Sequence, residues 1–226
     1  MLGPRSHNGE PIMNIFYLDK NPKIAAQMHC DKHVVKMITE TAQLLSTAHR
    51  ILDGKACVVS KMAYSKKNKN YTVKENYKHY HLEGDVYNED GILVPDKCPI
   101  YLAAYKNHPS AVWARLARGN YNWLSDLWGY LGIEYMHRYD KVHKAATLEN
   151  LFYSPKNIMY KTLLSGVRTA PPQCMPDHYK CNPNSASLDD VVSAYRAYYV
   201  GDKSYFAKWT NRPVPDWFTE TVKEVA

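Results

Sequence analysis

A stripe of polar side chains on one predicted helix has the residue types that general acid–base chemistry requires. The segment from 28 to 50 shows the apolar periodicity of a long helix. At about 100° per residue, His33, Lys36, Glu40 and Gln43 fall together beside its apolar face. Partial burial there can shift a pKa towards neutrality. We therefore expect Glu40, His33 and Lys36 to be catalytic and Gln43 to contact the substrate. The alternative is a solvated face with a Lys36–Glu40 ion pair.

A metal site on the same helix is the competing chemical interpretation. His29 and His33 are four residues apart, which suits two metal ligands on one helix face. Further ligands would have to come from elsewhere, such as His108 or His143, and no HExxH or paired CxxC pattern supplies them. We therefore predict no metal and no cofactor.

Three other segments carry residue types suited to substrate binding. Residues 107–115 contain a helix N-terminus, where N–H groups bind phosphate; residues 137–144 are a basic helical stretch; and residues 171–180 are a proline-rich loop. The substrate-binding candidates are Asn107, His108, Trp113, Arg115, Arg138, Tyr139, Lys141, His143, Gln173, Asp177 and Tyr179. The structural alternatives are a solvated face for the basic stretch and a simple connection for the loop.

Charge and composition favour a polyanionic partner. The 226-residue chain has a net charge of +7 and contains 19 tyrosines and five tryptophans, and aromatic rings among lysines suit stacked bases. We predict nucleic acid, DNA first, with Lys66, Lys67 and Lys69 as DNA-binding residues. Five scattered cysteines without a CxxC pair indicate a reducing, cytoplasmic compartment. No apolar run approaches the roughly 20 residues that span a bilayer, so we predict no membrane partner. Oligomeric state stays open.

The pattern along the chain predicts a mainly α protein: one helical domain with a short N-terminal strand and a small β-rich insertion. Residues 1–12 are expected to be a leader or disordered extension, with Met13 as the natural start, and residues 13–226 the domain. The predicted elements are a strand at 13–19, a helix at 23–52 that is either straight or bent, the insertion at about 55–99, a helix from 109, a further helix at about 133–151, a loop at 165–187, and a helix that begins at Ser187 and breaks at Gly201.

Several short segments resemble a family of small proteins encoded by tailed bacteriophages. They are MNIFYLD, CDKHVVKM, ETAQLLSTAHR, NHPSAVW, RYDKVHK and PPQCMPD, and the resemblance runs from Met13 to about Phe218 apart from the insertion. Family members have no assigned biochemical activity, so the resemblance implies a phage origin and action in the host cytoplasm, but no catalytic residues. A more distant likeness is to phage pyrimidine-dimer DNA glycosylases, which are small, basic and helical. Those enzymes use an N-terminal amine as nucleophile, which Asn14 cannot supply while residues precede it.

Three functions remain open at this point. The first is a DNA-processing enzyme that acts on bases, either glycosylase-like or base-modifying. The second is a non-catalytic nucleic-acid-binding or host-takeover protein, and the third is a metal-dependent hydrolase. The chain contains no GxxxxGK[ST], GxGxxG or GxSxG motif, so ATPase, dinucleotide-dependent and α/β-hydrolase functions have no local support.

Overall fold

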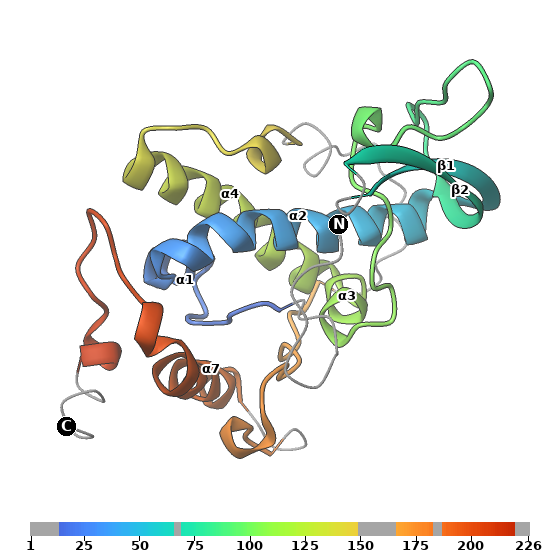
Figure 1. Ribbon diagram of the computed structural model, residues 1–226. Helices are drawn as coiled ribbons and strands as arrows, with labels where there is room; N and C mark the ends of the chain where they lie inside the picture. Colours follow the sequence, from blue (N-terminus) through green and yellow to red (C-terminus); the bar gives the residue numbers. More distant parts are fainter. Residues whose placement is uncertain (1–13, 66–68, 149–165, 183–186, 220–226) are drawn as a thin grey trace.

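The structure is a computed structural model that describes residues 14–65, 69–148, 166–182 and 187–219. Helices dominate, and one antiparallel hairpin extends from them (Figure 1). The elements are α1 (Pro22–Met28), α2 (Asp31–Asp53), β1 (Lys55–Ser65), β2 (Asn70–His81), η1 (Pro95–Lys97), α3 (Pro109–Ala114), α4 (Arg118–Tyr139), η2 (Lys144–Leu148), η3 (Asp177–Tyr179), α7 (Leu188–Lys203) and η4 (Ser204–Phe206). The mainly helical prediction is confirmed.

The predicted helix from Lys23 to Leu52 is in fact two helices. Asn21 caps α1 through a bond from the Lys23 N–H, and Pro22 occupies the first turn. The chain is then extended at His29 and Cys30 before α2 begins. The Cys30 N–H donates to the Tyr199 hydroxyl at 2.8 Å. Because that partner lies on α7, sequence periodicity alone cannot reveal the break.

Two further helix boundaries differ from the prediction. The helix that starts at Pro109 stops at Ala114, and α4 begins after Ala117. The first part of the predicted helix at about 133–151 is instead the end of α4, which runs to Tyr139 and is capped by Asp140 in the left-handed conformation, with φ of +52°. Residues 144–148 form η2, and residues 149–151 lie outside the described residues. Lys141 and His143 therefore follow α4 and do not share a helix face with Arg138.

The predicted N-terminal strand is absent from the described residues. Residues 14–18 are buried, but they pair with no strand. Side chains from α7 and α4 satisfy part of this backbone: Arg196 Nε donates to Leu18 O at 2.9 Å, and Trp123 Nε1 donates to Lys20 O at 2.9 Å. The segment is thus a buried part of the helical core.

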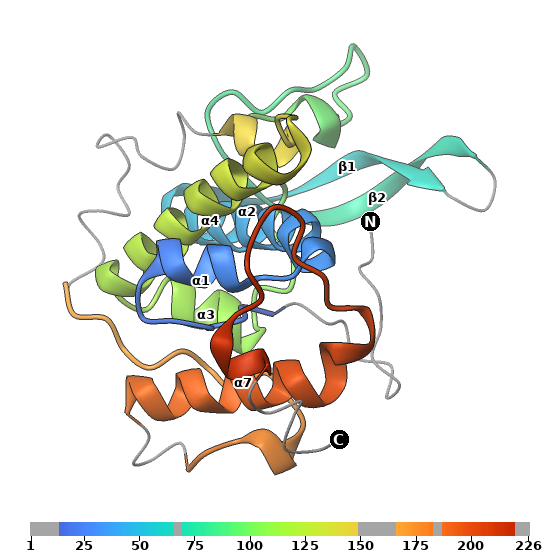
Figure 2. The same cartoon turned by 90° about the vertical axis from the view of Figure 1, so that its left-hand side faces the viewer.

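The predicted β-rich insertion is confirmed as a hairpin of β1 and β2. The strands pair from Lys55–His81 to Ser65–Asn70, with an irregularity between Val59 and Lys61. The hairpin projects away from the helices (Figure 2). Residues 66–68 lie outside the described residues, and Gly91, later in the insertion, adopts a left-handed turn conformation, with φ of +71°.

Helix α7 begins as predicted but does not break at Gly201. Ser187 is the N-cap and forms a reciprocal capping box with Asp190. The helix runs through Gly201 to Lys203. The Tyr179 ring lies against Gly201 and leaves no room for a Cβ atom. Glycine is therefore required here for close packing.

The core brings these helices together around aromatic side chains. Helix α4 packs against α1 and α2, and α3 packs against α2 (Figure 1). The largest buried rings include Tyr17, Tyr121, Trp128, Tyr195 and Tyr199. None of the helices within the described ranges has both the length and the apolar character needed to cross a membrane.

Candidate functional site

The centre of the candidate site is a buried carboxylate on α2. Glu40 is only 7% exposed, and its Oε2 accepts the backbone N–H of Asn14 at 3.3 Å. Its Oε1 lies 3.1 Å from Lys36 Nζ, in the i,i+4 pair that the sequence suggests. Burial raises the pKa of the Glu40 carboxyl, although Lys36 and the Asn14 N–H act in the opposite direction. A carboxyl whose pKa lies above its usual range is suited to proton transfer near neutral pH.

Asn14 connects Glu40 to the loop at Cys174 and to α7. Its amide nitrogen Nδ2 donates to Cys174 O at 2.8 Å, and its Oδ1 accepts from the Tyr195 hydroxyl at 3.2 Å. The Cys174 thiol lies 3.4 Å from the Ser110 hydroxyl at the start of α3. The predicted proline-rich loop is therefore linked to Glu40 through Asn14, which bonds both Glu40 and Cys174.

His33, on the same helix as Glu40, packs in a cluster of aromatic side chains from other segments. Its Nδ1 is 2.8 Å from the Tyr199 hydroxyl, and its ring stacks on Phe16 with centroids 4.3 Å apart. Burial is the main reason that the His33 pKa falls to about 2, with help from the charge of Lys36. The imidazole is therefore neutral at physiological pH and can accept or donate a hydrogen bond without carrying charge.

Lysines surround this part of the molecule. Lys36 contacts Glu40 and also contributes to the lowered His33 pKa, as does Lys203 at the end of α7. Lys203 Nζ lies 4.5 Å from the centroid of Tyr198, and Lys32 Nζ lies 4.9 Å from that of Phe206. The buried acid and imidazole thus have cations next to them, which suits an anionic substrate.

The histidine pair at 29 and 33 does not form a metal site with the predicted helpers. His29 is fully buried, its Nδ1 lies 2.6 Å from Ala25 O, and burial lowers its pKa to about 4. His33 is bonded to Tyr199. His108 accepts the Ser110 N–H and His143 accepts the Ala145 N–H, each within its own local turn.

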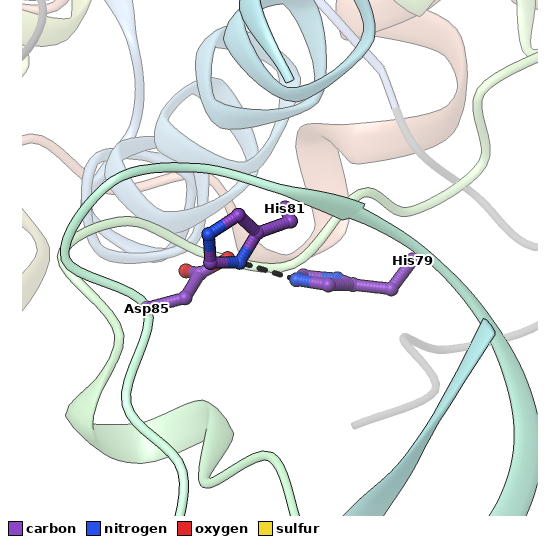
Figure 3. A group of neighbouring side chains, drawn as sticks. All are labelled: His79, His81 and Asp85. Carbon is purple, nitrogen blue, oxygen red and sulfur yellow. Dashed lines mark hydrogen bonds and ion pairs between the residues drawn. The ribbon is translucent and has the colours of Figure 1, made fainter. Parts of the chain in front are cut away.

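A different trio brings metal-capable atoms together at the base of the hairpin. Among the described residues, only His79, His81 and Asp85 form such a group (Figure 3). His79 Nε2 lies 2.8 Å from Asp85 Oδ2, and His81 Nδ1 lies 3.6 Å from the same oxygen. However, Arg50 contacts both carboxylate oxygens at 2.7 Å, and both side chains are fully buried.

The arginine decides how this trio should be interpreted. The bonds from Arg50 hold the Asp85 pKa well below its usual range, even though burial acts in the opposite direction. Asp85 Oδ2 also accepts the Leu82 N–H at 3.0 Å. A cation would therefore meet a carboxylate whose charge and lone pairs are already in use. We interpret the group as a structural clamp that fastens the hairpin to α2.

Three of the predicted substrate-binding residues have structural partners instead. Trp113 is 4% exposed and donates to Thr169 O at 3.2 Å. Arg115 donates to the carbonyls of Ala111 and Lys106, both at 2.7 Å. Arg138 is 4% exposed and bonds Glu134 at 2.7 Å and Asp31 at 2.9 Å, so its guanidinium is not presented to phosphate.

Other predicted substrate-binding residues are scattered around the surface. Asn107 and Lys141 are exposed, and His108 caps α3. Tyr139 donates to Asp31 O at 3.4 Å. His143 packs against Tyr135, with ring centroids 5.0 Å apart, and burial lowers its pKa. No contact links these residues to Glu40 in the described part of the chain.

The loop residues mainly brace their own loop. The Gln173 amide bonds both the N–H and the carbonyl of Cys181, at 2.8 and 2.9 Å. Asp177 is exposed and pairs with Lys180 at 2.7 Å. Tyr179 donates to Asp202 at 3.0 Å.

The remaining predicted residues are placed as follows. Gln43 is half-buried on α2, one turn beyond Glu40. Lys69 is exposed at the hairpin turn, with φ of +51°, whereas Lys66 and Lys67 lie outside the described residues.

A hollow of about 390 Å³ lies away from the Glu40 group, between α4 and residues 142–146. Its lining is mostly apolar, and its one carboxylate is Asp126, whose pKa is raised by burial. No predicted site residue lines this hollow. Because a single carboxylate offers little chemistry, we base the functional argument on Glu40.

Sequence reasoning missed the residues that complete the Glu40 and His33 surroundings. Asn14, Tyr195 and Tyr199 are all buried, and each bonds a residue more than 150 positions away. The only available signal was the presence of a polar Asn14 at the head of an apolar run. Comparison of the chain with models of protein families, with curated proteins and with solved structures finds no match in any of the three.

Proposed function

We propose that the protein is a phage-encoded DNA-processing enzyme that acts on bases in a DNA-glycosylase-like reaction, with Glu40 as the general base. The observation that carries the proposal is the environment of Glu40: a buried carboxylate with a raised pKa, beside a backbone N–H and a lysine. A plain solvated helix face would leave such a carboxylate exposed, with its ordinary acidity.

The chemistry follows from proton transfer at Glu40. Its carboxylate removes a proton from a water molecule as the water oxygen bonds to C1′ of the target nucleotide. The C1′–N bond breaks, and its electron pair leaves with the base, which takes a proton from solvent. Neutral His33 and the Lys36 ammonium supply hydrogen-bond donors, and the Lys36 charge favours the phosphates on either side.

An amine is a second route that the geometry allows. In a chain cleaved before Asn14, the backbone nitrogen that now donates to Glu40 would become a free α-amine 3.3 Å from the carboxylate. Attack of that amine on C1′ would break the C1′–N bond, and the base would leave with the electron pair and take a proton from solvent. Cleavage of the C1′–O4′ bond, with a solvent proton added to O4′, would then give an imine with the opened sugar, the chemistry that the likeness to phage glycosylases implies. Glu40 would then accept the amine proton.

The decisive experiment measures base release. The full chain and a chain that begins at Asn14 are incubated with ultraviolet-irradiated, phage-type and ordinary DNA, and the products are scored for free bases and abasic sites by mass spectrometry. Borohydride traps the imine of the amine route as a covalent protein–DNA adduct, whereas the water route gives none.

Variants separate catalysis from folding in that assay. Glu40→Gln is expected to lower the rate by roughly 10²–10⁴-fold, as removal of one acid–base group typically does. Glu89→Gln changes an exposed glutamate on the insertion and serves as the matched control. Normal base release by Glu40→Gln, or none by either wild-type chain on any DNA, would exclude the proposal.

A non-catalytic nucleic-acid-binding protein is the second candidate, and the exposed lysine-bearing hairpin favours it. Changing Lys66, Lys67 and Lys69 to serine should reduce the slope of log K against log salt by up to about 0.9 for each phosphate that the variant no longer binds. An unchanged slope would remove the hairpin turn from the interface. DNA binding by wild-type protein without base release would favour this candidate over the enzyme.

A further inference from the structure

Two tyrosines near the end of the hairpin form an exposed aromatic pair. Tyr64 on β1 and Tyr71 on β2 are directly opposite each other, and they are 54% and 55% exposed. Their ring centroids are 5.2 Å apart at an interplanar angle of 61°. Met62 and Val73 form the next pair on the same face, and Val73 is 51% exposed. Several apolar and aromatic groups therefore face solvent on an arm that projects from the helices (Figure 2).

The other two tyrosines of the hairpin are occupied. Tyr77 lies under Lys61 Nζ, 3.7 Å from the ring centroid, and its hydroxyl donates to Ala103 O at 3.4 Å. Tyr80 accepts a bond from Lys106 Nζ at 3.1 Å. Both are half-buried at the end of the hairpin that joins the body. Tyr77 and Tyr80 therefore anchor the hairpin to the body, whereas Tyr64 and Tyr71 expose their rings to solvent. The count of tyrosines in the sequence could not distinguish these two pairs.

The charges on the hairpin suit a polyanion. Lys61 and Lys74 are paired across the strands on the face opposite to Tyr64 and Tyr71, an arrangement of like charges that destabilises a ladder in isolation, and Lys61 also lies over the Tyr77 ring. Lys69 and Lys78 are exposed, and none of the hairpin lysines that the structure describes forms an ion pair. Anionic phosphates from a bound strand would relieve this repulsion.

One carboxylate argues for base contact at the tyrosine pair itself. The Tyr71 hydroxyl donates to Asp96 Oδ2 at 3.3 Å, which fixes the ring and places a negative charge beside it. Asp96 would repel a phosphate at this point, whereas an uncharged base can lie on a ring face. The lysines and the tyrosines therefore divide the contacts: lysines for phosphates, rings for bases.

We infer that Tyr64 and Tyr71 form a stacking platform for unpaired bases, so that the hairpin holds single-stranded or locally opened DNA. This inference deepens the proposed function, because it rests on DNA as the substrate and names the form of DNA that the arm takes. A base paired within a duplex keeps its faces covered by its neighbours and cannot use the platform.

The test compares the full chain on three fluorescent oligonucleotides of equal length: a thymidine single strand, a duplex, and a single strand of abasic spacers that keeps every phosphate. Anisotropy gives the dissociation constants. Tyr64→Ala/Tyr71→Ala should weaken binding to the thymidine strand by about 10-fold or more for each stacked base. The same variant should leave binding to the abasic strand and the duplex within about twofold of wild type.

Matched variants make the result specific to the ring faces. Tyr64→Phe/Tyr71→Phe keeps both rings and should bind like wild type, while Ile133→Ala changes an exposed apolar side chain on α4 and serves as the off-site control. Circular dichroism confirms folding of each variant. Equal losses of affinity on all three oligonucleotides would overturn the inference, and so would unchanged affinity for the thymidine strand. Absence of DNA binding by the wild-type protein would overturn it as well, including the case in which the hairpin binds a protein instead. Base release is scored separately on wild type, so stacking without base release would refute only the enzymatic proposal.

Discussion

Replacement of Glu40 by glutamine should abolish base release without unfolding the protein. Glutamine keeps the size of the side chain and can still accept the Asn14 N–H. The ion pair with Lys36 is removed, but that lysine side chain is 32% exposed, so the pair contributes only about 0.3–0.5 kcal/mol. The substitution also removes the negative charge of Glu40, which burial disfavours, and this offsets part of the lost stability. We expect the free energy of unfolding at pH 7 to change by less than about 1 kcal/mol.

The raised pKa of Glu40 also predicts the direction in which the unfolding free energy changes with pH. Because burial raises the Glu40 pKa in the folded state, the unfolded chain ionises first as pH rises from the ordinary value of 4.5. Wild type therefore loses stability through that window, and Glu40→Gln removes the loss. The difference in unfolding free energy between variant and wild type should shift in favour of the variant from pH 4 to pH 7.

The same acid-to-amide change at Asp85 should have the opposite result. Asp85 is fully buried against Arg50, and its pKa is lowered, so the pair stabilises the fold at neutral pH and loses that effect as pH falls. Asp85→Asn leaves a buried guanidinium without its counter-charge, which typically costs about 3–5 kcal/mol. The hairpin should detach or the protein should unfold.

Urea denaturation followed by tryptophan fluorescence, from pH 4 to pH 7.5, measures both variants on one scale, with base release scored in parallel. The expected pattern is a stable, inactive Glu40→Gln and a destabilised Asp85→Asn. A loss of about 3 kcal/mol or more in Glu40→Gln, the cost of breaking a buried ion pair, would show that its carboxylate is structural and would refute the reasoning.

Three further outcomes follow from the packing. Gly201→Ala should lower the unfolding free energy by about 1–3 kcal/mol, because its Cβ meets the Tyr179 ring, and adding Tyr179→Ala should recover part of that loss in a double-mutant cycle. Ser187→Ala should cost about 1 kcal/mol in urea titrations through loss of the capping box with Asp190; an unchanged midpoint would contradict it. Addition of Zn²⁺ should leave the melting temperature of the apoprotein unchanged, since the hairpin clamp is already neutralised by an arginine; a rise of several degrees in calorimetry would reinstate a metal site there.

Local signals in the sequence predicted several elements correctly. Ser187 marks the start of α7, the predicted helix start at 23 is one residue from that of α1 at Pro22, and the predicted β-rich insertion contains a hairpin. In each case the residues that decide the structure are close in sequence. The polar stripe with His33 and Glu40 was also readable, because helical periodicity placed both at the border of the apolar face.

Most wrong predictions concern residues whose structure depends on contacts with residues far away in the sequence. The Cys30 N–H at the break between α1 and α2 bonds Tyr199, and the glycine at 201 is needed because Tyr179 packs against it. Arg138 is a residue type that binds phosphate, but its guanidinium is paired both with Glu134, four residues earlier, and with Asp31, which is 107 positions away. Charge counted along a chain cannot show which cations are already paired inside the fold.

Helix α2 sets the spacing between the candidate chemistry and the arm. Glu40 and the helix end at Asp53 belong to one continuous helix, so they are separated by about 20 Å at roughly 1.5 Å per residue. At about 3.4 Å per base pair, that span equals some six base pairs of duplex. Insertion of one residue between them would turn the hairpin by about 100° around the helix axis. Helix α2 therefore fixes the distance from Glu40 to the base of the hairpin and the direction in which the hairpin leaves the helix, and for DNA bound as proposed these two quantities would set where along the strand the hairpin makes contact.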